Sequence, residues 1–262
     1  MTPRFSDTAS ALGSAAGQHA LVLWLLGLAL ALALAGWLGA RWRQRRTLGT
    51  RHWALCCALP ALALFTLLAT QVAAGASITH FDTALARTLQ VQASATLLHW
   101  ATVPTWAGDP PVVIALVAAV GAWLLWRRER LLALAWVAAV VGNALLNKGL
   151  KHLFERARPP HLHGIVHETG YSFPSGHASG TLAAYGMLAY VVLRLAPPAW
   201  HMPALLGAAW LAWTGACSRV LLQVHYASDV LAGLASGSVW LGLCILGLRH
   251  AQQRKRPTLL NQ

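Results

Sequence analysis

The sequence predicts an all-α protein, a polytopic transmembrane helix bundle. Hydrophobic residues make up 57% of its 262 residues, and charged residues make up only 10%. Several uncharged runs approach the roughly 20 residues that an α-helix needs to cross a bilayer, where it satisfies its own backbone hydrogen bonds. The net charge is +13, but the basic residues flank these apolar runs and form no soluble basic face. A nucleic-acid partner is therefore not expected.

Seven spans are expected along the chain. The segment before them, residues 1–18, carries only Arg4 and Asp7 and lacks the basic start of a cleaved signal peptide. Pro60 falls inside the second run, but a membrane helix tolerates an internal proline. The spans are expected at residues 20–40, 53–75, 111–126, 131–147, 178–193, 202–217 and 230–248.

The segment 76–108 interrupts the apolar pattern, because polar residues alternate there with leucines. We expect an amphipathic helix that lies in the outer membrane interface. A plain outer loop is the alternative, since the periodicity is irregular. The polar residues of this segment are His80, Asp82, Arg87 and His99.

The distribution of Lys and Arg predicts the orientation of the bundle. Arginine clusters follow the first span, fill the turn at 127–130 and recur in the tail at 251–262, and such clusters favour the cytoplasmic side. The amino end is therefore expected outside and the carboxyl end inside. The outer cations gather in the polar loop 148–176 and just after the sixth span, where an anion would use them: Lys148, Lys151, Arg156, Arg158 and Arg219.

Two further residue sets suggest no separate site. The four cysteines, at 56, 57, 217 and 244, lie in or beside apolar runs without a zinc-like spacing, and we expect small buried residues. His161, His163 and His167 lie in the polar loop with only Glu168 as a nearby acid. A metal site is possible in principle, but a solvated loop or pocket entrance is favoured.

Three stretches on the expected outer side carry reactive groups. They are the segment from Lys151 to Arg158-Pro159, the segment Pro174-Ser175-Gly176-His177, and the segment from Ser218-Arg219 through His225 to Asp229. If the third stretch is helical, His225 and Asp229 share a face, and the carboxylate holds the imidazole in one tautomer. Asp229 as a helix cap beside an interfacial histidine is the alternative.

Phosphate chemistry accounts for the three stretches together. Arginine presents a planar fork of donors that matches phosphate oxygens. Ser175 and Gly176 open an expected helix, whose free N–H groups and positive dipole end favour an anion. Singly, each residue is equally well explained as a span flank or a helix cap, but together they favour a phosphate site.

The three stretches resemble the signature of the type 2 phosphatidic acid phosphatase superfamily, which includes the vanadium-dependent haloperoxidases. The signature reads Lys-x6-Arg-Pro, Pro-Ser-Gly-His and Ser-Arg-x5-His-x3-Asp, and the chain matches every defining position in order. The resemblance implies that His225 is the nucleophile that forms a phosphohistidine, that Asp229 orients it, and that His177 is the acid and base. It implies phosphate binding by Lys151, Arg158, Ser175, Gly176, Arg219 and, less directly, Ser218, with no metal or cofactor.

The resemblance also implies a domain organisation. Residues 53–250 correspond to the six-span bacterial form, residues 1–52 add an amino-terminal span with a basic loop, and residues 251–262 form a basic cytoplasmic tail. The expected protein is a lipid phosphatase of the bacterial inner membrane, with its site facing the periplasm or exterior. The sequence leaves the oligomeric state open.

A membrane lipid phosphate is the expected substrate. Undecaprenyl diphosphate is favoured, followed by phosphatidic acid, phosphatidylglycerophosphate and a lipid A phosphate. The alternatives are a vanadate-dependent haloperoxidase, whose known relatives are soluble, and a non-catalytic transporter or scaffold, for which the chain lacks paired interrupted helices.

Overall fold

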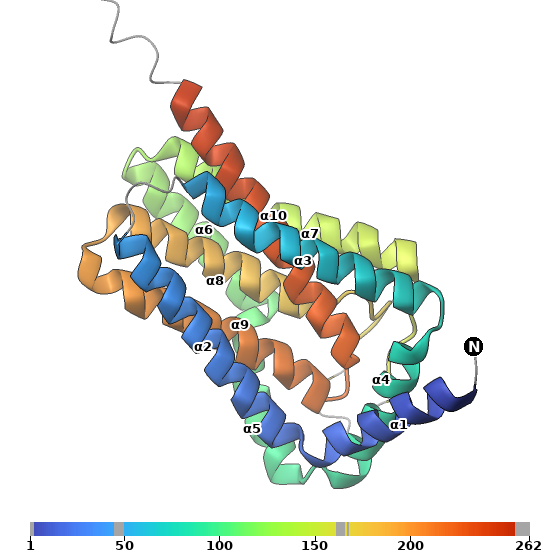
Figure 1. The fold of residues 1–262 in the computed structure, drawn as a ribbon. Helices are drawn as coiled ribbons and strands as arrows, with labels where there is room; N and C mark the ends of the chain where they lie inside the picture. Colours follow the sequence, from blue (N-terminus) through green and yellow to red (C-terminus); the bar gives the residue numbers. More distant parts are fainter. Residues whose placement is uncertain (1–2, 45–49, 161–165, 167, 255–262) are drawn as a thin grey trace, which may run out of the picture.

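A computed structural model describes residues 3–44, 50–160, 166 and 168–254, and these residues form helices joined by short connections (Figure 1). The helices, in chain order, are α1 (Pro3–Gln18), α2 (Ala20–Gln44), α3 (Thr50–Ala73), α4 (Ser77–Gln92), α5 (Ala95–Thr105), η1 (Trp106–Gly108), α6 (Pro110–Trp126), α7 (Arg130–Phe154), α8 (Gly176–Leu195), η2 (Pro198–Trp200), α9 (His201–Leu221) and α10 (Ala227–Arg254). The fold is therefore the all-α bundle that the sequence predicts.

Seven helical segments in the described chain are long and apolar enough to cross a membrane. Helix α8 packs against α7, α9 and α10, while α3 lies on α10 and α2 on α9. The outer faces carry large apolar side chains such as Leu30, which is 71% exposed on α2. Lipid is the solvent that suits such faces, because water would penalise them.

The interior of the bundle is built from small residues and a few large ones. Ala184 and Met187 of α8 are fully buried and pack against α7, where Trp136 is also fully buried. The Trp136 indole donates to Val117 O at 3.1 Å. Small residues let membrane helices approach closely, so dispersion contacts hold the helices together in an apolar solvent.

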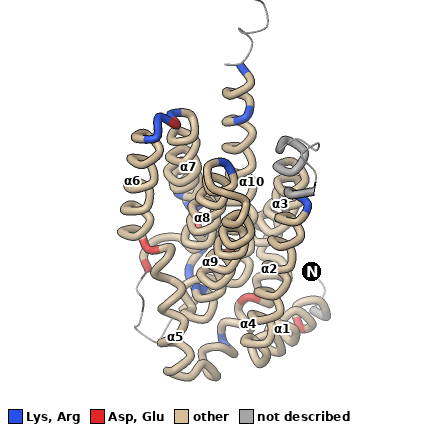
Figure 2. The backbone as a smooth tube through the Cα atoms, turned by 90° about the vertical axis from the view of Figure 1, so that its left-hand side faces the viewer, with Lys and Arg blue, Asp and Glu red and all other residues tan. Residues whose placement is uncertain are grey.

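The two ends of the bundle differ in charge. The loop between α6 and α7, the last turn of α8 and the end of α10 carry Lys and Arg at one end (Figure 2). The connections from α7 to α8 and from α9 to α10 lie at the opposite end, because α7 and α9 run antiparallel to α6 and α8. Helices α1, α4 and α5 lie at that opposite end as well.

The expected single helix at 76–108 is wrong in its extent. The structure has two helices there, α4 and α5, separated near Ala93 and Ser94, and Ser94 caps α5 by accepting from Leu97 N at 3.2 Å. The second of them is apolar, and the run 95–126 reads as one candidate span with a break at η1. The sequence pattern suggested one long amphipathic helix because polar residues are concentrated at 80–87. Of the two helices, only α4 is amphipathic.

Two other boundaries differ from the sequence prediction. The polar loop expected at 148–176 begins later, because α7 continues to Phe154 and carries Lys151 in its last turn. Residues 3–18 also form a helix, α1, which packs on α4. A Cβ placed on Gly13 would lie 2.3 Å from Phe81 O, so this glycine permits the close approach of the two helices.

The expected burial of the cysteines is wrong. Cys56 and Cys57 are exposed on α3, and Cys217 and Cys244 are only partly covered. Exposure to lipid costs a thiol nothing, which explains why an apolar run did not imply burial. The histidines at 161, 163 and 167, the arginines at 45 and 46, and the tail from 255 onward lie outside the described residues.

Candidate active site

The three sequence stretches meet at the end of the bundle away from the arginine-rich loop. The connection after α7 is tied to the segment before α8 by Ser172 N, which donates to Arg156 O at 2.8 Å. Ser175 N in turn donates to Asp229 O in the first turn of α10 at 2.9 Å. These backbone bonds join segments 16 and 54 residues apart and place their side chains around one point.

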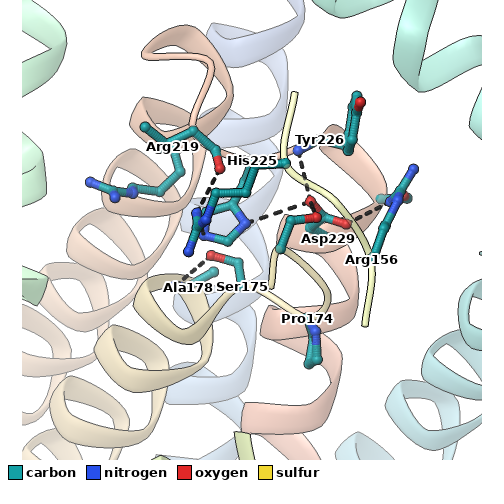
Figure 3. A network of polar contacts seen from close by, with 12 residues as sticks. Arg156, Pro174, Ser175, Ala178, Arg219, His225, Tyr226 and Asp229 are labelled. Atoms are coloured by element: carbon teal, nitrogen blue, oxygen red, sulfur yellow. Dashed lines mark hydrogen bonds and ion pairs between the residues drawn. The ribbon is translucent and has the colours of Figure 1, made fainter. Parts of the chain in front are cut away.

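His225 lies in the turn between α9 and α10, so the expected helical arrangement of His225 and Asp229 is wrong. Gln223 adopts a left-handed conformation with φ 55°, and His225 N then donates to Arg219 O at 3.2 Å. This reversal still brings His225 Nδ1 to 3.5 Å from Asp229 Oδ2 (Figure 3). A tight turn thus achieves the proximity that a helical face was expected to provide.

The surroundings of His225 select one protonation state. Arg158 Nη1 lies 3.2 Å from His225 Nε2, and because a guanidinium only donates, Nε2 is the acceptor. The ring proton then lies on Nδ1, facing Asp229. Burial lowers the pKa of His225 to about 4 although Asp229 opposes the change, so the imidazole is neutral at pH 7.

Asp229 is fully buried and accepts bonds on both carboxylate oxygens. Oδ2 accepts from Tyr226 N and from Ser172 Oγ, each at 2.9 Å, and faces the His225 ring. Oδ1 accepts from Arg156 Nη1 at 2.5 Å. Figure 3 shows the carboxylate between His225 on one side and Arg156 on the other. Asp229 therefore has a fixed orientation relative to the imidazole.

Arg158 and Arg219 lie on the other side of His225. Arg158 is held by carbonyl groups, with Nε donating to Gly170 O at 3.0 Å and Nη1 donating to Val224 O at 2.8 Å. Arg219 is 1% exposed and donates through Nη1 to Thr105 Oγ1 at 2.7 Å. Its Nε has no hydrogen-bond partner among the described residues. Both guanidinium groups are thus fixed by hydrogen bonds, and Arg158 lies directly beside the imidazole.

Glu168 bridges these two arginines. Its Oε1 accepts a short hydrogen bond from Arg219 Nη2, and its Oε2 lies 3.7 Å from Arg158 Nη2. Burial opposes ionisation of this carboxyl, but Arg219 and Arg158 outweigh burial and hold the pKa of Glu168 below its ordinary value. An ionised carboxylate therefore uses the donors that were predicted to hold a phosphate.

His177 lies in the first turn of α8, where the end of α5 holds it. Its Nε2 lies 2.7 Å from Thr105 O and 3.2 Å from Thr105 Oγ1. Because Arg219 donates to the same hydroxyl, Thr105 connects the predicted acid to a predicted phosphate ligand. Gly108, in η1 just after α5, also lies against the His177 ring, because a Cβ placed on Gly108 would lie 2.3 Å from His177 Nε2.

The remaining predicted site residues lie at the start of α8, at the end of α7 and at the end of α9. Ser175 is buried and caps α8, accepting from Ala178 N at 3.4 Å, and Gly176 is the first residue of that helix. Lys151, in the last turn of α7, is partly buried and close enough to interact electrostatically with Arg158 and Asp229. The Ser218 hydroxyl, in the last turn of α9, donates to Gly215 O of its own helix at 2.7 Å.

The structure adds a buried ion network that the sequence did not predict as part of the site. Arg156 donates to Asp229 and also, through Nη2, to Asp82 Oδ2 of α4 at 2.8 Å. Burial would lower the pKa of Arg156, but Asp229 and Asp82 outweigh it and raise that pKa. Burial raises the pKa of Asp82, although Arg156 and Ser228 oppose the change.

Sequence reasoning missed Asp82, Thr105, Arg156, Glu168 and Ser172 as site residues. Arg156 carried a signal, since it is one of the outer cations. Asp82 carried a weaker one, as a carboxylate in an otherwise leucine-rich segment. Within the described part of the chain, no group of three His, Cys, Asp or Glu side chains is arranged to hold a metal ion.

Comparisons with known proteins place the chain in a family. The family model described as PAP2 superfamily matches residues 130–253. Phosphatidylglycerophosphatase B of Bacillus subtilis is 32% identical over 141 residues, which are 51% of this chain and 66% of the relative. Decaprenylphosphoryl-5-phosphoribose phosphatase of Mycobacterium tuberculosis is 34% identical over 144 residues, which are 54% of this chain and 74% of the relative.

A lipid A 1-phosphatase of Rhizobium johnstonii is 35% identical over 130 residues, covering 44% of this chain and 49% of the relative. The chain therefore spans from about half to about three quarters of the length of these relatives. A solved structure, the transmembrane PAP2 type phosphatidylglycerolphosphate phosphatase from Bacillus subtilis, superposes with a TM-score of 0.65 and 28% identity. That superposition covers 75% of this chain and 98% of the other.

Proposed function

The chain belongs to the PAP2 superfamily, and on that premise we propose that it is a metal-independent phosphatase acting on a membrane lipid phosphate. One observation carries the proposal. His225 has Asp229 at one ring nitrogen and Arg158 at the other, so a neutral imidazole and a phosphate-binding cation lie side by side. This arrangement suits nucleophilic attack by nitrogen on phosphorus.

In the first step His225 Nε2 attacks the phosphorus of the substrate, and the bond from phosphorus to the lipid oxygen breaks. The attack produces a phosphohistidine and leaves the Nδ1 proton facing Asp229, which stabilises the positive charge that develops on the ring. Arg158 and Arg219 hold the phosphoryl oxygens, with Lys151 adding positive charge. When the substrate is bound, a phosphate oxygen accepts the hydrogen bond that Arg158 donates to His225 Nε2 in the free protein.

His177 has the role of acid and then base. The imidazolium form of His177 gives a proton to the lipid oxygen as that oxygen leaves, and the neutral ring then takes a proton from the water that cleaves the phosphorus–nitrogen bond. The products are inorganic phosphate and the lipid alcohol, or inorganic phosphate and the lipid monophosphate when the substrate is a diphosphate. Because His177 Nε2 bonds Thr105 O, the ring must exchange this bond for one to the leaving oxygen if Nε2 is the donor.

The substrate class follows from where the site lies. Its residues are at helix ends beside apolar, lipid-facing surface, so a phosphate attached to a bilayer lipid reaches them without leaving the membrane. The chain's relatives are named as phosphatases of phosphatidylglycerophosphate, of lipid A and of decaprenylphosphoryl-5-phosphoribose. We include undecaprenyl diphosphate beside these phosphomonoesters, with the site facing the exterior of the bacterial inner membrane.

Phosphate release from a lipid panel tests the proposal. The purified protein in detergent with a metal chelator is supplied with phosphatidylglycerophosphate, phosphatidic acid, lipid A 1-phosphate and undecaprenyl diphosphate. We expect release from at least one lipid, and a loss of about three orders of magnitude or more in kcat for His225→Ala. Mass spectrometry of acid-labile phosphorylated peptides from the wild type locates the intermediate.

Two outcomes would contradict the proposal. No release from any lipid in the panel excludes a lipid phosphatase of this class. Release that persists unchanged in His225→Ala excludes His225 as the nucleophile, even if hydrolysis itself is real. Arg87→Gln on the exposed face of α4 is the matched control and is expected to retain full activity.

A further inference from the structure

Asp229 orients His225 only if hydrogen bonds hold both of its carboxylate oxygens. The oxygen that faces the ring, Oδ2, already accepts from Tyr226 N and Ser172 Oγ. The other oxygen, Oδ1, is bound by Arg156 Nη1 at 2.5 Å. Without this bond Oδ2 keeps its two partners, but Oδ1 loses its charged partner and the carboxylate is held less firmly against His225.

Arg156 itself is held on three sides. Its Nη1 also donates to Ser228 Oγ at 2.8 Å, and its Nη2 donates to Asp82 Oδ2 at 2.8 Å. Its guanidinium carbon lies 4.3 Å from the centroid of the Tyr226 ring. The planar fork of arginine bridges two carboxylates at once, which the single ammonium of lysine does not reproduce.

Asp82 is the far end of this bridge. It is 1% exposed, and its Oδ1 accepts from Ser228 N at 3.1 Å while Oδ2 accepts from Ser228 Oγ. A buried charge is costly unless it is paired and hydrogen-bonded, and here every contact of Asp82 leads toward Asp229. The residue comes from α4, which lies outside the candidate spans.

The charges explain why two carboxylates share one arginine. An arginine paired with Asp229 alone neutralises it and weakens its attraction for a positively charged imidazole. Asp82 balances Arg156 instead, so Asp229 keeps its negative charge for His225. Arg156 and Asp82 together therefore hold Asp229 in place without cancelling its negative charge.

We propose that Arg156 and Asp82 are positioning residues for the Asp229–His225 pair, through which α4 stabilises the reactive orientation of the nucleophile. The proposal rests on the proposed function for its kinetic consequences. It does not rest on it for the orientation of His225, which is measurable in the protein without substrate.

The kinetic test uses Asp82→Asn, which keeps the shape and removes the charge. Because Asp82 touches no group that holds the phosphate, we expect kcat to fall about tenfold or more, with KM and the inhibition constant of inorganic phosphate unchanged. Arg156→Met is expected to lose at least as much, and Arg156→Lys to recover only part. The double variant Asp82→Asn/Arg156→Met should lose less than the product of the two single losses, because the two residues act together.

A second measurement reports on His225 directly. The 15N chemical shifts of histidine-labelled protein in detergent distinguish the two neutral tautomers, and His225→Ala identifies the signal. We expect the Nδ1-protonated form in both proteins, because Arg158 keeps Nε2 as an acceptor, and a changed Nδ1 shift in Asp82→Asn, because the contact of Nδ1 with Asp229 changes. Glu155→Gln, an exposed carboxylate next to Arg156 in the chain, is the matched control and should match the wild type.

An Asp82→Asn protein with wild-type kcat or a wild-type Nδ1 shift of His225 would overturn the inference. So would equal losses in kcat and in phosphate affinity, which indicate general damage to the site. If the wild type releases no phosphate from any lipid, the proposed function fails, and the comparison of Nδ1 shifts still decides the role of Asp82.

Discussion

At the scale of single residues, the neutral, buried His225 makes the folded protein sensitive to acid. Its pKa of about 4 lies below the ordinary 6.5, so the unfolded chain takes up this proton first as the pH falls. The folded state keeps its full stability above pH 6.5 and loses roughly 3 kcal/mol between 6.5 and about 4 from this one group.

Thermal unfolding in detergent from pH 7 to pH 4 measures this effect. The apparent Tm of the wild type is expected to fall more steeply than that of His225→Gln, whose amide does not titrate. Parallel curves for the two proteins would show that His225 is not held neutral in the folded state.

Glu168 allows a second prediction at this scale. Its carboxylate binds Arg219 and Arg158, the two guanidinium groups that we assign to the substrate phosphate, so carboxylate and phosphate compete for the same donors. Glu168→Gln removes the competing charge, and inorganic phosphate is expected to inhibit about tenfold more tightly, a change of about 1.4 kcal/mol in binding.

Steady-state inhibition by phosphate measures this change, with Glu129→Gln as the control because Glu129 lies at the opposite end of the bundle. Weaker inhibition in Glu168→Gln would mean that Glu168 supports phosphate binding and does not compete with it.

At the scale of the helices, two short elements outside the long spans shape the site. Helix α4 carries Asp82 inward, while its close contact with α1 through Gly13 fixes its position at the end of the bundle. Helix α5 ends at Thr105, which contacts both His177 and Arg219. Polar groups on these two elements thus contact the candidate site residues from outside the long helices of the bundle.

At the scale of the whole molecule, the charge difference between the two ends predicts the orientation in the membrane. The Arg127–Arg130 turn and the end of α10 share one end, and the site lies at the other. Basic clusters remain on the cytoplasmic side, so the site is expected to face the exterior.

Reporter fusions test this orientation. A fluorescent protein that folds only in the cytoplasm is expected to be bright when fused to the carboxyl end and dark when fused after Phe154. Alkaline phosphatase, which is active only outside, should give the reverse pattern. A bright signal after Phe154 would place the site on the cytoplasmic side and refute the orientation.

Local sequence determined much of this protein. The apolar runs specify the seven candidate spans, because the hydrophobic requirement of a bilayer applies to each helix by itself. The spacing within each motif likewise places Ser175 and Gly176 at the start of α8 and brings His225 close to Asp229. The catalytic and phosphate-binding roles of these residues stay predictions until the variants are measured.

Only the tertiary structure decided which distant residues complete the site. Asp82 and Arg156 are 74 positions apart, and Thr105 is 72 from His177. Such contacts depend on how α4 and α5 pack on the bundle, which no local pattern encodes. The turn around His225 was missed for the same reason, since an interaction with Arg219 O replaced the expected helix. Hydrophobicity acts on each segment separately, whereas the geometry of a buried ion network exists only once the segments are packed together.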